Sequence, residues 1–117
     1  MAEMLLSVLE TAHFHKEARK LLSEAELNDA IYAIASNPEI GDIMQGTGGV
    51  RKFRVAKGSR GKSAGSRIVY YYHDMDTPVF FLTIFAKNER DNLSGSERND
   101  LAASVKGMVA AYNRRRS

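Results

Sequence analysis

The spacing of apolar residues predicts a pair of helices in the first third of the chain. An apolar stretch over residues 4–10 can form a short strand, and Thr11 behind it has the side chain of a helix N-cap. A second helix begins at Ser23, because Ser23 and Glu26 have the spacing of a capping box, and it ends before Pro38. The apolar residues fall on one face of each helix: Phe14, Ala18, Leu21 and Leu22 in the first, and Leu27, Ala30, Ile31 and Ile34 in the second. The two helices should form a hairpin.

Three runs rich in Val, Ile, Tyr and Phe predict consecutive strands over residues 50–56, 66–74 and 79–86. The polar connection after the first run is too short for a helical crossover, and the second connection is a tight turn, so both pairings should be antiparallel. The stretch 41–49, with its four glycines, is expected to be a flexible connection. It is not a phosphate-binding P-loop, because no Lys-Ser or Lys-Thr pair follows the last glycine.

The end of the chain predicts a third helix. Ser94 and Glu97 repeat the capping-box spacing, and the helix should run up to the arginines at 114–116. Its apolar residues again share one face: Leu101, Val105, Met108, Val109 and Tyr112. With 117 residues in total, these elements predict one α+β domain over residues 1–117.

Composition and charge narrow the function. The chain has no cysteine, which excludes disulfide scaffolds, thiolate zinc sites and cysteine nucleophiles and fits a reducing cytoplasm. We find no signal peptide or membrane span in it. The net charge of +3 divides into −5 over residues 1–49 and +8 over residues 50–117, and the stretch 51–67 holds seven cations and no anion. Such a field predicts a polyanionic partner.

Strand alternation gathers several of these cations. Lys52 and Arg54 should face the same way, about 6.6 Å apart at Cα, and Arg67 on the next strand can lie beside them. Lys87, just past the third strand, can close the same surface. By contrast, His13 and His15 point to different helix faces and His73 stands alone, so the sequence predicts neither a metal site nor a cofactor.

Three motifs in this order resemble one family. They are GTGGVRKFRV at 46–55, GSRIVYY at 65–71 and FAKNE at 85–89, and they look like the strand motifs of RelE/HigB toxins from bacterial toxin–antitoxin modules, within the RelE/ParE superfamily and closest to its HigB branch. The resemblance implies a compact antiparallel sheet with an N-terminal helical hairpin and a C-terminal helix. It also implies a metal-independent endoribonuclease that cuts messenger RNA in the ribosomal A site, and a cognate antitoxin that suppresses it.

The resemblance suggests roles for the cations. Lys52 and Arg54 match the family's basic strand pair, Arg67 its phosphate-stabilising arginine, and Lys87 its segment after the last strand. Because neighbouring cations disfavour a charged lysine, Lys52 is our candidate base, with Lys87 and then Arg90 as candidate acids for the leaving oxygen. Asn88 and Ser94 depart from the best-known pattern at positions where it has arginine and tyrosine. The residues expected to contact RNA or the ribosome are Arg51, Lys57, Arg60, Lys62, Tyr71 and Arg90.

Two other functions fit parts of the pattern. One is a ParE-like toxin that inhibits DNA gyrase by contact, and the other is a general RNA-binding module. A pure binder has no need for Lys52, Arg54 and Arg67 to converge, so the sequence favours the ribosome-dependent nuclease. Its expected partners are an antitoxin of the helix-turn-helix type, the ribosome and messenger RNA, with no membrane, and its expected location is the cytoplasm.

Overall fold

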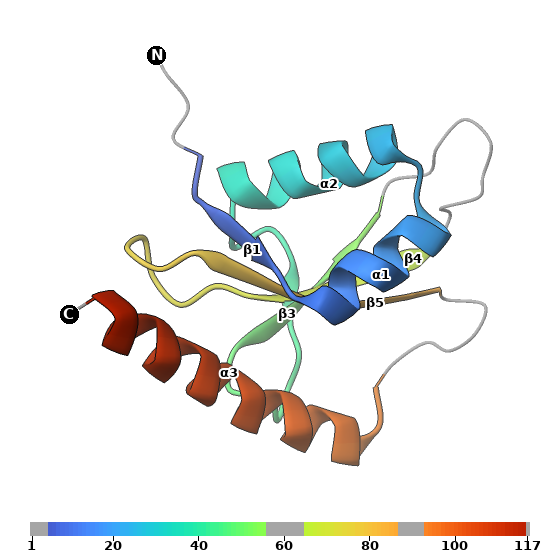
Figure 1. Ribbon diagram of the computed structural model, residues 1–117. Helices are drawn as coiled ribbons and strands as arrows, with labels where there is room; N and C mark the ends of the chain where they lie inside the picture. Colours follow the sequence, from blue (N-terminus) through green and yellow to red (C-terminus); the bar gives the residue numbers. More distant parts are fainter. Residues whose placement is uncertain (1–4, 56–64, 87–92, 117) are drawn as a thin grey trace.

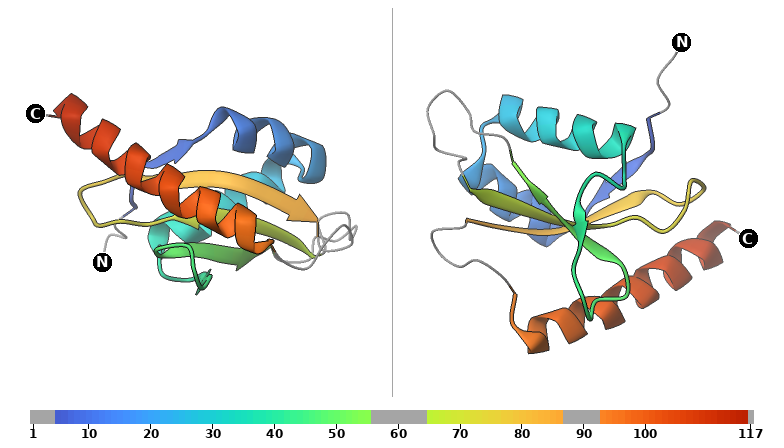
Figure 2. Two further views of the ribbon diagram at one scale, coloured as in Figure 1. Left: turned by 90° about the horizontal axis from the view of Figure 1, so that it is seen from below. Right: turned by 180° about the vertical axis from the view of Figure 1, so that it is seen from behind.

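The elements of the protein form three layers. The structure, a computed structural model, describes residues 5–55, 65–86 and 93–116. Helices α1 (Ala12–Leu21) and α2 (Glu24–Ser36) cover one face of a central sheet, and α3 (Gly95–Arg116) crosses the other (Figures 1 and 2). We call these two surfaces of the sheet the hairpin face and the α3 face.

The sheet has five strands in the order β1-β5-β4-β3-β2. Its centre is the predicted antiparallel meander of β3 (Val50–Arg54), β4 (Ser66–Tyr71) and β5 (Val79–Ala86). The first strand, β1 (Val8–Glu10), adds to the edge of β5 in parallel, so the sheet is mixed. A short apolar run in the sequence shows that a strand can form, but not which distant strand it joins or in which direction.

Both helices of the hairpin begin at the predicted caps. The Thr11 hydroxyl accepts a hydrogen bond from the backbone N–H of Phe14 at 3.1 Å, and Ser23 and Glu26 form the full capping box. The Thr11 hydroxyl also donates to the carbonyl of Leu82 at 3.1 Å. Leu82 lies where the register between β4 and β5 shifts, so the start of α1 is tied to this irregularity of the sheet.

A buried core lies between the hairpin and the sheet. Phe14 of α1 and Phe81 of β5 meet edge to face, with ring centroids 5.2 Å apart. The other fully or nearly buried members of this core are Ala18, Leu22, Leu27, Ala30, Ile34, Val55, Ile68, Tyr70, Val79 and Ile84. The predicted apolar faces of both helices are therefore confirmed.

The glycine-rich stretch is more ordered than the sequence indicates. It contains the two-residue strand β2 (Asp42–Ile43), which pairs antiparallel with β3. The turn that follows is built around Thr47, whose fully buried hydroxyl donates to the Met44 carbonyl at 2.6 Å and accepts from the Val50 N–H at 3.0 Å. Our expectation of a flexible connection here was wrong, because a buried threonine and a strand edge order the segment.

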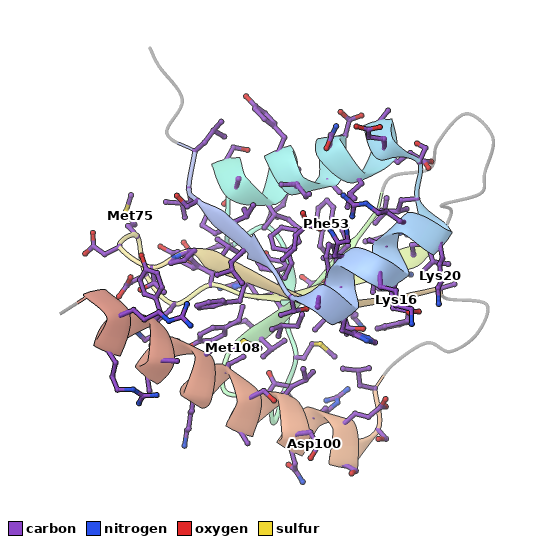
Figure 3. All side chains as sticks on the ribbon, viewed as in Figure 1. Lys16, Lys20, Phe53, Met75, Asp100 and Met108 are labelled. Atoms are coloured by element: carbon purple, nitrogen blue, oxygen red, sulfur yellow. The ribbon has the colours of Figure 1, made fainter. Side chains whose placement is uncertain are left out.

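The C-terminal helix α3 packs on the opposite side of the sheet. Its capping box is present as predicted, with the Glu97 N–H donating to the Ser94 hydroxyl at 3.1 Å and the Ser94 N–H to the Glu97 carboxylate at 2.9 Å. Figure 3 shows Met108 directed from α3 toward the sheet and Phe53 on the hairpin side. The second core contains Met44, Val50, Val69, Phe80, Leu82, Phe85, Leu93 and Val105.

Candidate nucleic-acid site on the α3 face

Three predicted site residues meet on one face of β3 and β4. Arg54 and Arg67 are direct cross-strand partners, and Lys52 lies two residues before Arg54 on the same face, opposite Val69. Cβ atoms of such partners are about 4.5–5.5 Å apart. The cations Lys52, Arg54 and Arg67, which we call the cationic cluster, therefore converge as the sequence predicted.

The cations of the cluster form no ion pairs among the described residues. Lys52 and Arg67 are half-buried and Arg54 is exposed, and no carboxylate in the described part of the chain forms an ion pair with any of the three. The Arg67 guanidinium donates a long hydrogen bond, 3.4 Å, to the Ser66 carbonyl. Like charges directly across two strands destabilise a sheet. A cluster that weakens the fold in this way is a candidate for binding an external anion.

Arg51 lies apart from the cluster. It projects from the hairpin face of β3, where its guanidinium donates to the carbonyls of Gly41 at 2.8 Å and Glu39 at 3.1 Å. It also forms an ion pair with the Glu39 carboxylate at 3.7 Å, and its side chain is only 16% exposed. Its charge holds the segment between α2 and β2 in place.

Tyr71 shares the α3 face but not the cluster. It pairs with Val50, at the opposite end of β3 from Arg54, and packs beside α3 as a partly buried member of the second core. Its hydroxyl lies 3.2 Å from Nδ1 of His73. The strand register thus separates Tyr71 from Arg67 by four residues, about 13 Å along the strand.

The remaining predicted site residues belong to two other segments. Lys57, Arg60 and Lys62 fall in residues 56–64, and Lys87 and Arg90 in residues 87–92, all outside the described residues. The described residues that border these segments lie at the same end of the sheet as Arg67, because the Val55 N–H donates to the Ser66 carbonyl and Ser66 pairs with Ala86.

The histidines lie away from the cationic cluster. His13 lies at the start of α1, and its Nε2 is 3.0 Å from the hydroxyl of Thr83 on β5. Nδ1 of His15 is 3.7 Å from the Glu10 carboxylate. Across the described ranges, no three His, Asp or Glu side chains are grouped as metal ligands would be. No helix in those ranges is long and apolar enough to cross a membrane.

The structure brings one residue to this face that sequence reasoning missed. Asp42 of β2 is the cross-strand partner of Lys52, so a carboxylate lies beside the cationic cluster. The strand that carries Asp42 has only two residues and lies in the glycine-rich stretch. It is too short to show the alternation or the enrichment in β-branched residues by which strands are predicted. The pairing of Asp42 with Lys52 therefore could not be predicted from the sequence.

Chemically, the cationic cluster can hold a phosphate and stabilise added negative charge. Two guanidinium groups offer several N–H donors in planar forks that match phosphate oxygens, and the lysine adds a movable donor. Such a face is suited to binding a phosphodiester backbone.

Comparison with known proteins identifies the family. The family model for the RelE toxin of the RelE/RelB toxin–antitoxin system matches residues 6–115, so the chain belongs to the RelE toxin family, whose members are translation-inhibiting ribonucleases. Membership also implies a cognate antitoxin as partner. The finer placement in the HigB branch stays a prediction.

A solved structure shows the same fold. The Escherichia coli toxin RelE, an arginine-to-alanine double mutant in the free state, is 21% identical to this chain with a TM-score of 0.57. The match covers 86% of this chain and 97% of that one. The α+β architecture with an N-terminal hairpin and a C-terminal helix is thus confirmed. Neither comparison favours the ParE-like alternative.

Proposed function

We propose that this toxin cuts messenger RNA in the ribosomal A site and thereby stops translation. The observation that supports the proposal best is the convergence of Lys52, Arg54 and Arg67, none of which forms an ion pair with a described carboxylate. A small domain with such a cluster has little surface to orient a flexible RNA, so the ribosome supplies the substrate geometry. This function places the toxin in the cytoplasm with translating ribosomes.

The proposed reaction is an internal transesterification. The ribose 2′-oxygen forms a bond to the adjacent phosphorus, the bond from phosphorus to the 5′-oxygen breaks, and the proton lost by the 2′-hydroxyl is balanced by one gained by the leaving oxygen. The products are a 2′,3′-cyclic phosphate and a 5′-hydroxyl end. Arg67, supported by Arg54, stabilises the negative charge that grows on the phosphorane oxygens. Proton transfer falls to Lys52 and to Lys87 or Arg90.

The test is RNA end mapping in a purified translation system. The wild-type protein should cut messenger RNA in the A site and leave cyclic phosphate ends, while naked RNA is cut poorly. Cleavage should persist after chelation that keeps ribosomes intact. Efficient magnesium-dependent cutting of free RNA, or inhibition of DNA gyrase with no RNA cleavage, would contradict the proposal.

We further propose that the antitoxin is a helix-turn-helix protein that binds tightly enough to abolish cleavage. A cationic surface and the outer side of helix α3 both offer sites for such a partner. Co-expression with the adjacent reading frame should restore growth. Growth arrest that continues while both proteins are demonstrably made would count against this pairing.

A further inference from the structure

The strand β2 places the carboxylate of Asp42 beside the cationic cluster. None of the three sequence motifs that predicted the site includes this strand. Asp42 pairs with Lys52 across β2 and β3, and cross-strand partners place their side chains on the same face. The core confirms the orientation, since Met44 and Val50, at the matching alternate positions, are buried on the α3 face. Asp42 and Lys52 thus share the face that carries Arg54 and Arg67.

The backbone around Asp42 is held on both sides. Before it, the Gly41 N–H donates to the Tyr70 hydroxyl at 2.9 Å and the Gly41 carbonyl accepts from Arg51 at 2.8 Å. After it, the Met44 N–H donates to the Val50 carbonyl at 2.8 Å. The approach at Gly41 is close, because a Cβ there would lie 3.0 Å from the Lys52 carbonyl oxygen and 2.9 Å from the Tyr70 ring. β2 is therefore fixed against Lys52.

Among the acidic residues of the described strands, Asp42 is the one that lies beside the cationic cluster. The described strands contain two acidic residues, Asp42 and Glu10. Glu10 pairs with Phe81 on the hairpin face and lies 3.6 Å from Arg19 of α1. Asp42 is exposed and forms no ion pair with any residue that the structure describes, so its side chain can turn toward Lys52 by rotation about its own bonds.

We propose that Asp42 is a positioning residue for Lys52, and this inference rests on the proposed nuclease function. Its negative charge attracts the Lys52 side chain, which Arg54 and Arg67 repel, and holds Nζ at the edge of the cluster. Lys52 keeps the proton-transfer role proposed above, and Asp42 fixes the orientation of its side chain.

The inference makes binding and chemistry respond in opposite directions. Removing a negative charge beside the RNA should leave ribosome and RNA binding unchanged or slightly tighter. Losing the group that orients Lys52 should slow the chemical step about 10- to 100-fold. A substitution that merely damaged the fold would weaken both, and one that merely made the surface more positive would weaken neither.

The experiment is single-turnover cleavage on programmed ribosomes over a range of toxin concentrations. Asp42→Asn should lower the saturating rate about 10- to 100-fold without raising the half-saturating concentration, and Asp42→Glu should recover most of the rate. In a Lys52→Met background, Asp42→Asn should have no further effect. The matched control is Asp29→Asn, which removes the same charge from an exposed position on α2. A saturating rate within twofold of wild type, or equal losses in both backgrounds, overturns the inference.

A second measurement separates this inference from the proposed function. In the free protein with nitrogen-15 lysine, the Lys52 Nζ resonance should move in Asp42→Asn and stay unchanged in Asp29→Asn. If the Lys52 resonance moves but the wild-type protein does not cleave RNA, the nuclease proposal is wrong and the pairing of Asp42 with Lys52 stands. If the resonance does not move but the wild-type protein cleaves RNA, the pairing alone is wrong. Thermal unfolding of both variants near the wild-type temperature shows that the fold is intact.

Discussion

Arg51 and Arg54 lie three residues apart on the same strand and have opposite surroundings. Arg51 is nearly enclosed on the hairpin face, with two carbonyls and a carboxylate around its guanidinium. Arg54 is exposed on the α3 face, directly across from another arginine. The charge of a residue therefore does not identify a site by itself. Our candidate site rests instead on cations that form no ion pair with any described carboxylate.

The two faces of the sheet differ in the same way. On the hairpin face, apolar packing runs from Phe14 to Val55, and Tyr70 and Arg51 have hydrogen-bonded partners. On the α3 face, apolar packing covers Val50 and Val69 and continues to Phe85 beside Arg67, while Lys52, Arg54 and Arg67 take neighbouring positions of β3 and β4. The hairpin face thus consists of packed core and satisfied polar groups, and the α3 face carries the proposed site.

The largest expected effect is a loss of stability from the hairpin core. Phe14→Ala should lower the free energy of unfolding by about 3–5 kcal/mol, because the ring is fully buried and meets Phe81 edge to face. Urea unfolding measures the change. The corresponding change on the α3 face, Val105→Ala, should cost less because it removes fewer buried atoms. Equal losses would show that the two cores do not differ as described.

Arg51→Ala should destabilise the protein and Arg54→Ala should not. Arg51→Ala should cost about 1.5–3 kcal/mol, since hydrogen bonds of a charged donor are removed. Arg54→Ala should leave stability unchanged or raise it slightly, because it removes a like-charge pair. Urea unfolding at low and high salt compares the two, and comparable destabilisation by both would remove the distinction between the faces.

Tyr70→Phe should destabilise the protein by about 1–3 kcal/mol. The hydroxyl donates to the Pro38 carbonyl at 2.7 Å and accepts from Gly41 at 2.9 Å, so its removal leaves both groups without their partner. Cleavage by the folded fraction should change little, because the phenol lies on the hairpin face. A loss of cleavage without a loss of stability would contradict this separation.

The same phenol gives a pH test. Burial raises the pKa of Tyr70, although the Gly41 hydrogen bond opposes the rise. The folded state therefore keeps the proton to a higher pH than the unfolded state does, and stability should fall as pH rises above about 10. Tyr70→Phe should reduce this fall, as measured by urea unfolding between about pH 9 and pH 11. An identical pH dependence in the two proteins would contradict the linkage.

The smallest expected effect is on docking. Lys57, Arg60 and Lys62 are expected to bind ribosomal phosphates, so replacing all three with alanine should weaken binding in a salt-dependent way. Each phosphate interaction removed should change the slope of log affinity against log salt by about 0.7. The saturating cleavage rate should be preserved, and a large drop in that rate would place one of these residues in the chemistry.

The sequence predicted the elements well where the signal is local. Capping boxes at Ser23 and Ser94 and the apolar stripes depend on neighbours within one or two turns, and the structure confirms them. Alternation along β3 and β4 also predicted that Arg67 would lie beside Lys52 and Arg54. The direction of β1 and the strand β2 were missed, because both depend on partners distant in sequence or on a two-residue strand.

Within the site, alternation could indicate which face a cation takes but not what surrounds it. Arg51 and Arg54 look alike in sequence, and only folding brings Glu39 and the Gly41 carbonyl around Arg51. Tyr71 falls on the predicted face, but the register with Val50 takes it to the far end of β3. The position of Asp42 beside Lys52 depends on the pairing of β2 with β3, which the sequence does not indicate.

The most direct test of the central claim is the single-turnover cleavage rate of Arg67→Ala on ribosomes saturated with toxin. Circular dichroism first shows the variant folded, and Arg19→Ala on α1 provides the charge-matched control. If the cationic cluster stabilises the transition state, the Arg67→Ala rate falls about 100- to 1,000-fold while ribosome binding largely persists and the control stays near wild type. An unchanged rate in Arg67→Ala would contradict the catalytic role of the cluster and favour a toxin that acts by binding alone.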